Sequence, residues 1–283
     1  MKNISEILPQ FNNWLKYVRN DRDDTIYLRN TILLRFEKDI QKPIKSITLE
    51  DIWAWRESLN RKGLTNQTQR TYISSIRIFF QFCDEKKWTS LDFFQIKAPK
   101  VVAKRVVYLT PEEIEQFVSV IKSVKYRAIV ECLLSTCCRI GELLAINKES
   151  IDFENSQVNI IGEKNGLERT VVFTERAMFW LKKYLKTRKD NKSPLFLANT
   201  GNRLTRGTVE NVIRNYSEAS GIEKKITPHI FRHSGATLLY NRTGDIALVK
   251  DYLGHQSIEV TDKSYRGVFS PRVIISAKNN LIF

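Results

Sequence analysis

Apolar residues recur at helical spacing through most of the first 95 residues, and this pattern constrains the fold more than any other feature. Positions three and four apart share one face of a helix, so the spacing gives each segment a single apolar stripe. It predicts four helices, over residues 4–18, 25–36, 49–59 and 66–85. The first part of the chain is therefore expected to be a small all-helical domain.

The fourth of these segments, residues 66–85, has two distinct faces. Its apolar stripe consists of Ile73, Ile76, Phe80 and Cys83, and its polar stripe of Gln67, Arg70, Ser74 and Arg77. One face can pack while the other meets phosphates and base edges. Arg70 and Arg77 are therefore candidate DNA-binding residues, although a solvated charged face would have the same pattern.

The charge balance indicates a polyanionic partner. The 283 residues include 46 Lys and Arg against 31 Asp and Glu, a formal net charge of +15, while 42% hydrophobic residues exclude a disordered basic tail. We expect nucleic acid rather than a membrane, because the chain lacks a long apolar run, a terminal basic amphipathic segment and a lipidation motif. The beginning of the sequence also lacks the features of an export signal.

The cysteines support the same setting. Cys83, Cys132, Cys137 and Cys138 form no CxxC pair, which is poor spacing for a disulfide framework or a zinc finger. A reducing, cytoplasmic environment is therefore expected.

Residues 97–109 read as a basic linker, because they carry cations, no acidic residue and no helical period. Thr110-Pro111-Glu112-Glu113 then marks a new helix, with Thr as N-cap and Pro in the first turn. This predicts three parts: a helical domain at 1–96, the linker, and a second domain at 110–283. Such a linker can follow a DNA backbone while the domains clamp the duplex. The candidate phosphate contacts in it are Lys100, Lys104 and Arg105.

The second domain is predicted to be mainly α with a small β-sheet. Asn165-Gly166 lies between two β-rich runs, which is typical of a hairpin. The runs cover residues 157–161 and 169–173, and the predicted helices cover 112–124, 126–137, 139–146, 175–187, 208–220, 228–240 and 246–253.

The three histidines of the chain, His229, His233 and His255, all fall in its last 55 residues. Thr227 and Pro228 can start a helix whose first turns carry His229, Arg232 and His233, and a helix N-terminus favours phosphate. A three-histidine zinc site is the alternative. It is disfavoured because no HExxH glutamate is present and Arg232, between two ligands, would repel a cation. We therefore expect no metal.

Taken alone, Arg139 and Glu142 in CCRIGELL are an ordinary i, i+3 ion pair. Together with a Lys in the hairpin turn, HIFRHSGATLL, LGHQS and a following Tyr, they resemble the tyrosine recombinase (phage integrase) family in its Xer-like form. The matching positions are Arg139, Glu142, Lys164, His229, Arg232, His255 and Tyr265. Three features depart from the family pattern: Cys137 replaces a common Gly, the turn around Lys164 lacks the usual Gly-Lys-Gly, and one extra residue separates His255 from Tyr265.

The chemistry of phosphodiester cleavage assigns two of these positions directly, because planar guanidinium groups can contact a phosphate bidentately and stay charged. Arg139 and Arg232 are therefore the predicted phosphate clamp. The resemblance implies the remaining roles. Tyr265 attacks the phosphate, Lys164 protonates the leaving 5′ oxygen, His229 accepts the tyrosine proton, and His255 holds a phosphate oxygen. Glu142 orients either Arg139 or the histidine without contacting the DNA itself, and His233 has a structural role.

The resemblance further implies a helical core-binding domain, a catalytic domain and a homotetramer assembled on two duplex DNA sites, with no cofactor and no metal. An Xer-like role in resolving DNA dimers during chromosome segregation is expected, with a mobile-element integrase of the same chemistry as the alternative. A non-catalytic DNA-binding regulator, a metal-dependent nuclease and a type IB topoisomerase-like enzyme are the rivals. The apolar residues within 273–283 could dock on a neighbouring subunit or on their own domain. Any accessory protein stays open.

Overall fold

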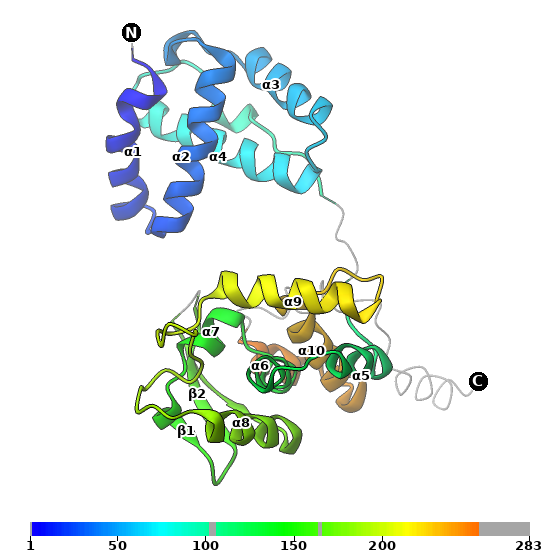
Figure 1. The fold of residues 1–283 in the computed structure, drawn as a ribbon. Coiled ribbons are helices and arrows are strands. Elements are labelled where there is room, and N and C mark those ends of the chain that lie inside the picture. Colours follow the sequence, from blue (N-terminus) through cyan, green and yellow to red (C-terminus); the bar gives the residue numbers. More distant parts are fainter. Residues whose placement is uncertain (1, 102–105, 164–165, 255–283) are drawn as a thin grey trace, which may run out of the picture. The chain divides into compact units, whose positions relative to one another are not determined.

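The computed structural model describes residues 2–101, 106–163 and 166–254. The chain divides into two compact units, residues 1–102 and 103–283 (Figure 1). Each unit has its own hydrophobic core. In the described part of the chain, no helix is both long enough and apolar enough to cross a membrane.

The first unit is all-helical, as predicted. Threonine side chains fix two helix starts: Thr48 forms a capping box with Asp51, and Thr65 accepts a hydrogen bond from the Thr68 N–H. Aromatic rings fill much of the core, where Phe11 and Phe79 meet edge to face at 5.3 Å. The helices are α1 (Ile4–Tyr17), α2 (Asp23–Ile40), α3 (Leu49–Arg61) and α4 (Asn66–Glu85), with short 3-10 turns at η1 (Ile44–Ser46) and η2 (Phe93–Gln95).

Helix α4 separates its two faces as the sequence predicts. The stripe of Ile73, Ile76, Phe80 and Cys83 is buried, whereas Arg70 and Arg77 are exposed. The Arg77 guanidinium lies 6.0 Å from the centre of the Phe94 ring. Further along, Ile96 is buried in the core of this unit and Lys100 is exposed.

The second unit is mainly helical with one antiparallel sheet of strand order β1-β2-β3, which confirms the predicted fold class. In the hairpin, Ile160 of β2 pairs with Arg169 of β3. The strands are β1 (Ile151–Asp152), β2 (Gln157–Ile161) and β3 (Glu168–Val172), and the helices are α5 (Pro111–Ser119), α6 (Val124–Thr136), α7 (Ile140–Ala145), η3 (Lys148–Ser150), α8 (Glu175–Thr187), α9 (Arg206–Ser220), α10 (Pro228–Thr243) and α11 (Ile246–Leu253).

Helix α6 runs through the centre of this unit and packs against both α8 and α10 (Figure 1). Its contact with α10 is close at Gly235, where a Cβ atom would lie only 2.2 Å from the carbonyl oxygen of Leu134. The missing side chain lets the two backbones approach, which brings the end of α6 beside the first turns of α10.

Two local predictions were wrong. The helix expected over residues 112–124 ends at Ser119, because Ile121 turns into the core and α6 begins separately at Val124. Ile121 and Val124 are both apolar and three positions apart, so periodicity alone could not reveal the break between the two helices. The two-residue strand β1 was not predicted, since it is too short to show an alternation.

Candidate active site

The site begins where α6 ends. Cys137 adopts the left-handed conformation, with φ 48° and ψ 22°, and its N–H donates to the Leu133 carbonyl. The chain then turns through buried Cys138 to Arg139, whose extended backbone is the N-cap of α7. A left-handed residue is where glycine is favoured, at a cost of roughly 1–2 kcal/mol for other residues. The backbone thus keeps a glycine-like turn although cysteine occupies it.

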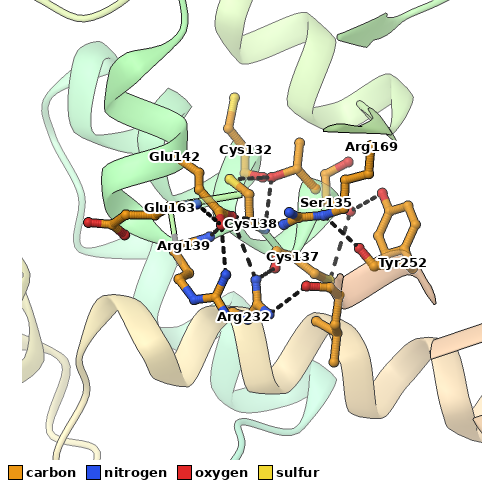
Figure 2. A network of polar contacts seen from close by, with 12 residues as sticks. Cys132, Ser135, Cys137, Cys138, Arg139, Glu142, Glu163, Arg169, Arg232 and Tyr252 are labelled. Atoms are coloured by element: carbon orange, nitrogen blue, oxygen red, sulfur yellow. Dashed lines mark hydrogen bonds and ion pairs between the residues drawn. The ribbon is translucent and has the colours of Figure 1, made fainter. Parts of the chain in front are cut away.

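Glu142 of α7 is the centre of the site, and its side chain is fully buried (0% exposed). Its carboxylate accepts hydrogen bonds from the Arg139 N–H (2.8 Å), Arg139 Nη1 (2.7 Å) and Arg169 Nη2 (2.8 Å). The N–H of Glu163 donates to it as well, at 3.3 Å. Arg232 Nη1 lies 3.9 Å away as an ion-pair partner, so three arginines share one carboxylate (Figure 2).

The ionisation of Glu142 follows from these neighbours. Burial raises the pKa of its carboxyl, but the hydrogen bonds and charge of Arg169 and Arg139 outweigh burial and lower the pKa to about 2. The group is therefore ionised at neutral pH. Three guanidinium charges against one carboxylate leave an excess of positive charge, which suits an anion such as a phosphate.

The two clamp arginines differ in their surroundings. Arg232 of α10 is 4% exposed and donates to the carbonyls of Cys137 (2.7 Å) and Leu253 (2.9 Å). Burial, followed by the charge of Arg139, lowers the pKa of Arg232. Arg139 is 17% exposed and, among the described residues, donates hydrogen bonds to Glu142 alone. Arg139 is thus the more accessible of the two.

The histidines of α10 precede and follow Arg232 on the same helix. His229 is exposed in the first turn, and its ring centre is 6.3 Å from that of His233, which is half-buried. Burial, followed by the charges of His229 and Arg232, lowers the pKa of His233 to about 4, so it is neutral at pH 7. His229 also lines a cavity of about 650 Å³ together with Arg214 of α9 and Lys225.

Several predicted site residues lie outside the described part of the chain. They are Lys104, Arg105, Lys164, His255 and Tyr265, together with the apolar residues of 273–283. Two of them directly follow described residues: Glu163, after strand β2, precedes Lys164, and Gly254, left-handed at φ 66°, precedes His255. His255 also belongs to the zinc alternative; among the described residues, no group of three or more His, Cys, Asp or Glu is placed to hold a metal ion.

Two other tyrosines, Tyr252 and Tyr240, have structural surroundings. The hydroxyl of Tyr252 donates to the Ser135 carbonyl (3.0 Å) and accepts from the Val172 N–H (3.3 Å), and burial raises its pKa. Tyr240 packs on a small apolar cluster that includes Cys137 and Val249. A buried, hydrogen-bonded phenol is poorly suited to attack a phosphate.

Arg169 is a site residue that the sequence motifs did not predict. It follows the hairpin turn and shares a strand face with Val171, which is buried. Alternation therefore placed a cation on the inward face of β3, and an inward cation requires an acidic partner. That signal could have identified Arg169 as a partner of Glu142.

Fold and site together are those of a tyrosine recombinase, a class of enzyme that breaks and rejoins DNA strands. Residues 107–270 match the model of the phage integrase family, and the chain belongs to that family. The resemblance drawn from the motifs is therefore confirmed.

The chain is similar to named relatives over most of its length. It is 31% identical over 271 residues to tyrosine recombinase XerD of Oceanobacillus iheyensis, covering 90% of this chain and 91% of the relative. Tyrosine recombinase XerA of Pyrococcus horikoshii is 28% identical over 260 residues, covering 91% and 87%. Among solved structures, the Tn1549 transposon integrase in complex with a circular intermediate DNA superposes with a TM-score of 0.79 at 22% identity, covering 95% of this chain and 98% of that one.

Proposed function

We propose that this enzyme is a site-specific recombinase that cleaves duplex DNA through a 3′-phosphotyrosyl intermediate and rejoins the strand to a new partner. One observation carries the proposal: Arg139 and Arg232, from two different helices, converge on the single buried carboxylate of Glu142. Glu142 holds Arg139 by hydrogen bonds, and the carbonyls of Cys137 and Leu253 hold Arg232, so a phosphate meets preorganised donors.

In the proposed reaction, the hydroxyl oxygen of Tyr265 attacks the phosphorus and the bond to the 5′ oxygen breaks. His229 takes the tyrosine proton, Lys164 gives a proton to the departing 5′ oxygen, and His255 donates to a non-bridging oxygen. Arg139 and Arg232 neutralise the charge that builds on the phosphate. The phosphotyrosyl bond conserves the energy of the broken bond, so rejoining by a 5′ hydroxyl needs neither ATP nor a metal.

The partner in this proposal is duplex DNA. The positive charge of the chain and the exposed arginines of α4 support contacts to phosphates by the first unit and the linker, at Arg70, Arg77, Lys100, Lys104 and Arg105. The Tn1549 integrase, whose solved structure is a complex with DNA, supports the same partner. Exchange between two sites requires four cleavages, for which a homotetramer is the proposed assembly.

The proposed biological role is Xer-like resolution of DNA dimers, supported by the XerD and XerA relatives. A plasmid with two directly repeated sites tests it, because resolution converts one circle into two smaller ones. Formation of separate circles from directly repeated sites, but not from inverted sites, would support the role. Relaxation of supercoils without exchange would contradict it.

Covalent capture tests the chemistry. Nicked duplexes with randomised arms, incubated in chelator, should yield a protein–DNA adduct that resists denaturant and maps to Tyr265 by peptide mass. Tyr265→Phe should bind DNA but form no adduct. Arg139→Ala and Arg232→Ala should each slow adduct formation by about 10²–10³-fold, as removal of one preorganised donor does. An adduct on Tyr252 or Tyr240, or one that requires metal, would contradict the mechanism.

A further inference from the structure

Arg169 contacts two parts of the site that are far apart in the sequence: Glu142 of α7 and the C-terminal end of α11. It lies on β3, is 11% exposed, and directs Nη2 to the Glu142 carboxylate at 2.8 Å. Its Nε donates to the carbonyl of Tyr252, in the last turn of α11, at 3.2 Å. One planar guanidinium therefore holds both the carboxylate behind Arg139 and the end of the helix that precedes His255 (Figure 2).

The end of α11 is held by two arginines. The last carbonyls of a helix lack partners within it, and cations near a helix C-terminus are favourable. Arg169 takes the carbonyl of Tyr252, and Arg232 takes that of Leu253 at 2.9 Å. The next residue, Gly254, lies directly against Arg169, because a Cβ atom there would be 3.0 Å from Nη1. Both guanidinium groups thus fix the C-terminal end of α11, which comes just before residue 255.

We infer that Arg169 is a positioning residue that couples the Arg139–Glu142–Arg232 clamp to the turn before His255. The inference rests on the proposed function for its catalytic consequence, while the contacts themselves do not depend on it. Arg169 acts through Glu142 and through the α11 carbonyl. Lysine at this position could keep the charge beside Glu142, but a single ammonium has no planar fork to hold both partners.

The protonation of Glu142 is one readout of this coupling. The groups that face the carboxylate are Arg139 at the start of α7, Arg169 of β3, Arg232 of α10, the thiol of Cys138 and the backbone N–H of Glu163. Against the effect of burial, the hydrogen bond from Arg169 is the largest contribution that lowers the pKa of Glu142, followed by the backbone hydrogen bond from Arg139 and the charge of Arg169. Without the contributions of Arg169, the pKa of Glu142 rises. Glu142 then becomes protonated, and no longer orients Arg139, at a higher pH than in the unsubstituted protein.

The test compares Arg169→Gln, Arg169→Lys and a matched control, Arg188→Gln. Arg188 is 7% exposed, pairs with Asp190 and donates to the carbonyls of Pro194 and Leu195, but it does not contact Glu142. Single-turnover adduct formation is measured on the duplexes that the unsubstituted protein captures from the nicked pool. Hydrogen exchange of the α11 amides is measured without DNA.

Arg169→Gln should slow adduct formation about 10- to 100-fold, the loss that is typical of residues supporting a reactive group from behind. Its rate should fall more steeply between about pH 7 and pH 5 than the rate of the unsubstituted protein. Arg169→Lys should restore the pH profile of the unsubstituted protein and part of the rate. The α11 amides should exchange faster in Arg169→Gln and at the original rate in Arg188→Gln.

A rate and pH profile in Arg169→Gln equal to those of the unsubstituted protein would overturn the inference. So would equal losses in the Arg188→Gln control, or no rescue by Arg169→Lys, since both indicate a general loss of stability. If the unsubstituted protein captures no duplex, the proposed function fails instead. The exchange of the α11 amides then still decides whether Arg169 holds that helix.

Discussion

At the scale of single residues, buried charges in the second unit occur in sets. Glu142 has Arg139, Arg169 and Arg232 around it, and Glu131, 5% exposed, accepts from both Arg127 and Arg176 at 2.8 Å. Burying one carboxylate is costly unless cations and hydrogen bonds accompany it. The Glu131 set contains none of the motif residues, whereas the Glu142 set contains Arg139 and Arg232, so shared carboxylates alone do not define an active site.

Tyr252 and Tyr240 give a matched test of structural tyrosines. The Tyr252 hydroxyl has partners at Ser135 and Val172, whereas in the described part of the chain Tyr240 has no hydrogen bond from its hydroxyl. Tyr252→Phe should therefore lower the free energy of unfolding by about 1–2 kcal/mol, and Tyr240→Phe should change it little. Both variants should still form the covalent adduct. Thermal unfolding and adduct capture measure the two effects, and loss of the adduct in Tyr252→Phe would move the nucleophile there.

His233 predicts a dependence of stability on pH. Its pKa in the folded protein is about 4, below the ordinary 6.5, so the folded state disfavours the proton that the unfolded chain accepts. Stability is therefore lost as the pH falls from about 6.5 to 4, by up to about 3 kcal/mol at 1.36 kcal/mol per pKa unit. His233→Gln should lack this loss. Denaturant unfolding at a series of pH values measures it, and parallel curves for the two proteins would contradict the assignment.

At the scale of elements, the sequence was sufficient to locate the start of a helix wherever a cap and apolar periodicity agreed. Helices α3, α4 and α8 begin where a threonine cap precedes an apolar stripe. Strands β2 and β3 pair on either side of the sequence Asn165-Gly166. The sequence motifs also selected Arg139, Glu142 and Arg232, which the structure brings together in one cluster. Tertiary packing decided the rest: the break between α5 and α6, and the link from Arg169 to α11, depend on contacts between segments up to 83 positions apart. Such contacts leave no local pattern.

Two helical glycines, Gly235 of α10 and Gly207 of α9, should respond in opposite ways to substitution by alanine. A Cβ at Gly235 would meet the Leu134 carbonyl at 2.2 Å, and backbone cannot move aside as a side chain can. Gly235→Ala should therefore destabilise the protein by about 1–3 kcal/mol or more, as overpacking of a core does. A Cβ added at Gly207 of α9 would have no atom within 4 Å apart from its chain neighbours and the backbone of its own helix, so Gly207→Ala should stabilise by about 0.5–1 kcal/mol. Thermal unfolding of the two variants decides, and a stabilised Gly235→Ala would refute the close approach.

At the scale of the whole molecule, the excess of cations matters more than any single contact. Each phosphate that the protein neutralises releases counterions, so affinity for DNA falls with salt in proportion to the number of phosphates contacted. The net charge of +15 predicts that the affinity falls as the salt concentration rises, but it does not say which cations contact the phosphates. Because the term is independent of sequence, it can be measured on a duplex of any sequence, before the recombination site is known.

The linker provides the sharpest test at this scale. Replacing Lys100, Lys104 and Arg105 together by Ala should make the log–log dependence of affinity on salt shallower by about 3, since each phosphate contact contributes about 0.9. The matched control replaces Lys182, Lys183 and Lys186, three exposed cations of α8, and removes the same charge from a surface without a proposed DNA contact. Fluorescence anisotropy over a salt series gives both slopes. If the two triple variants change the slope equally, the linker acts only through net charge, and its place in the DNA interface is lost.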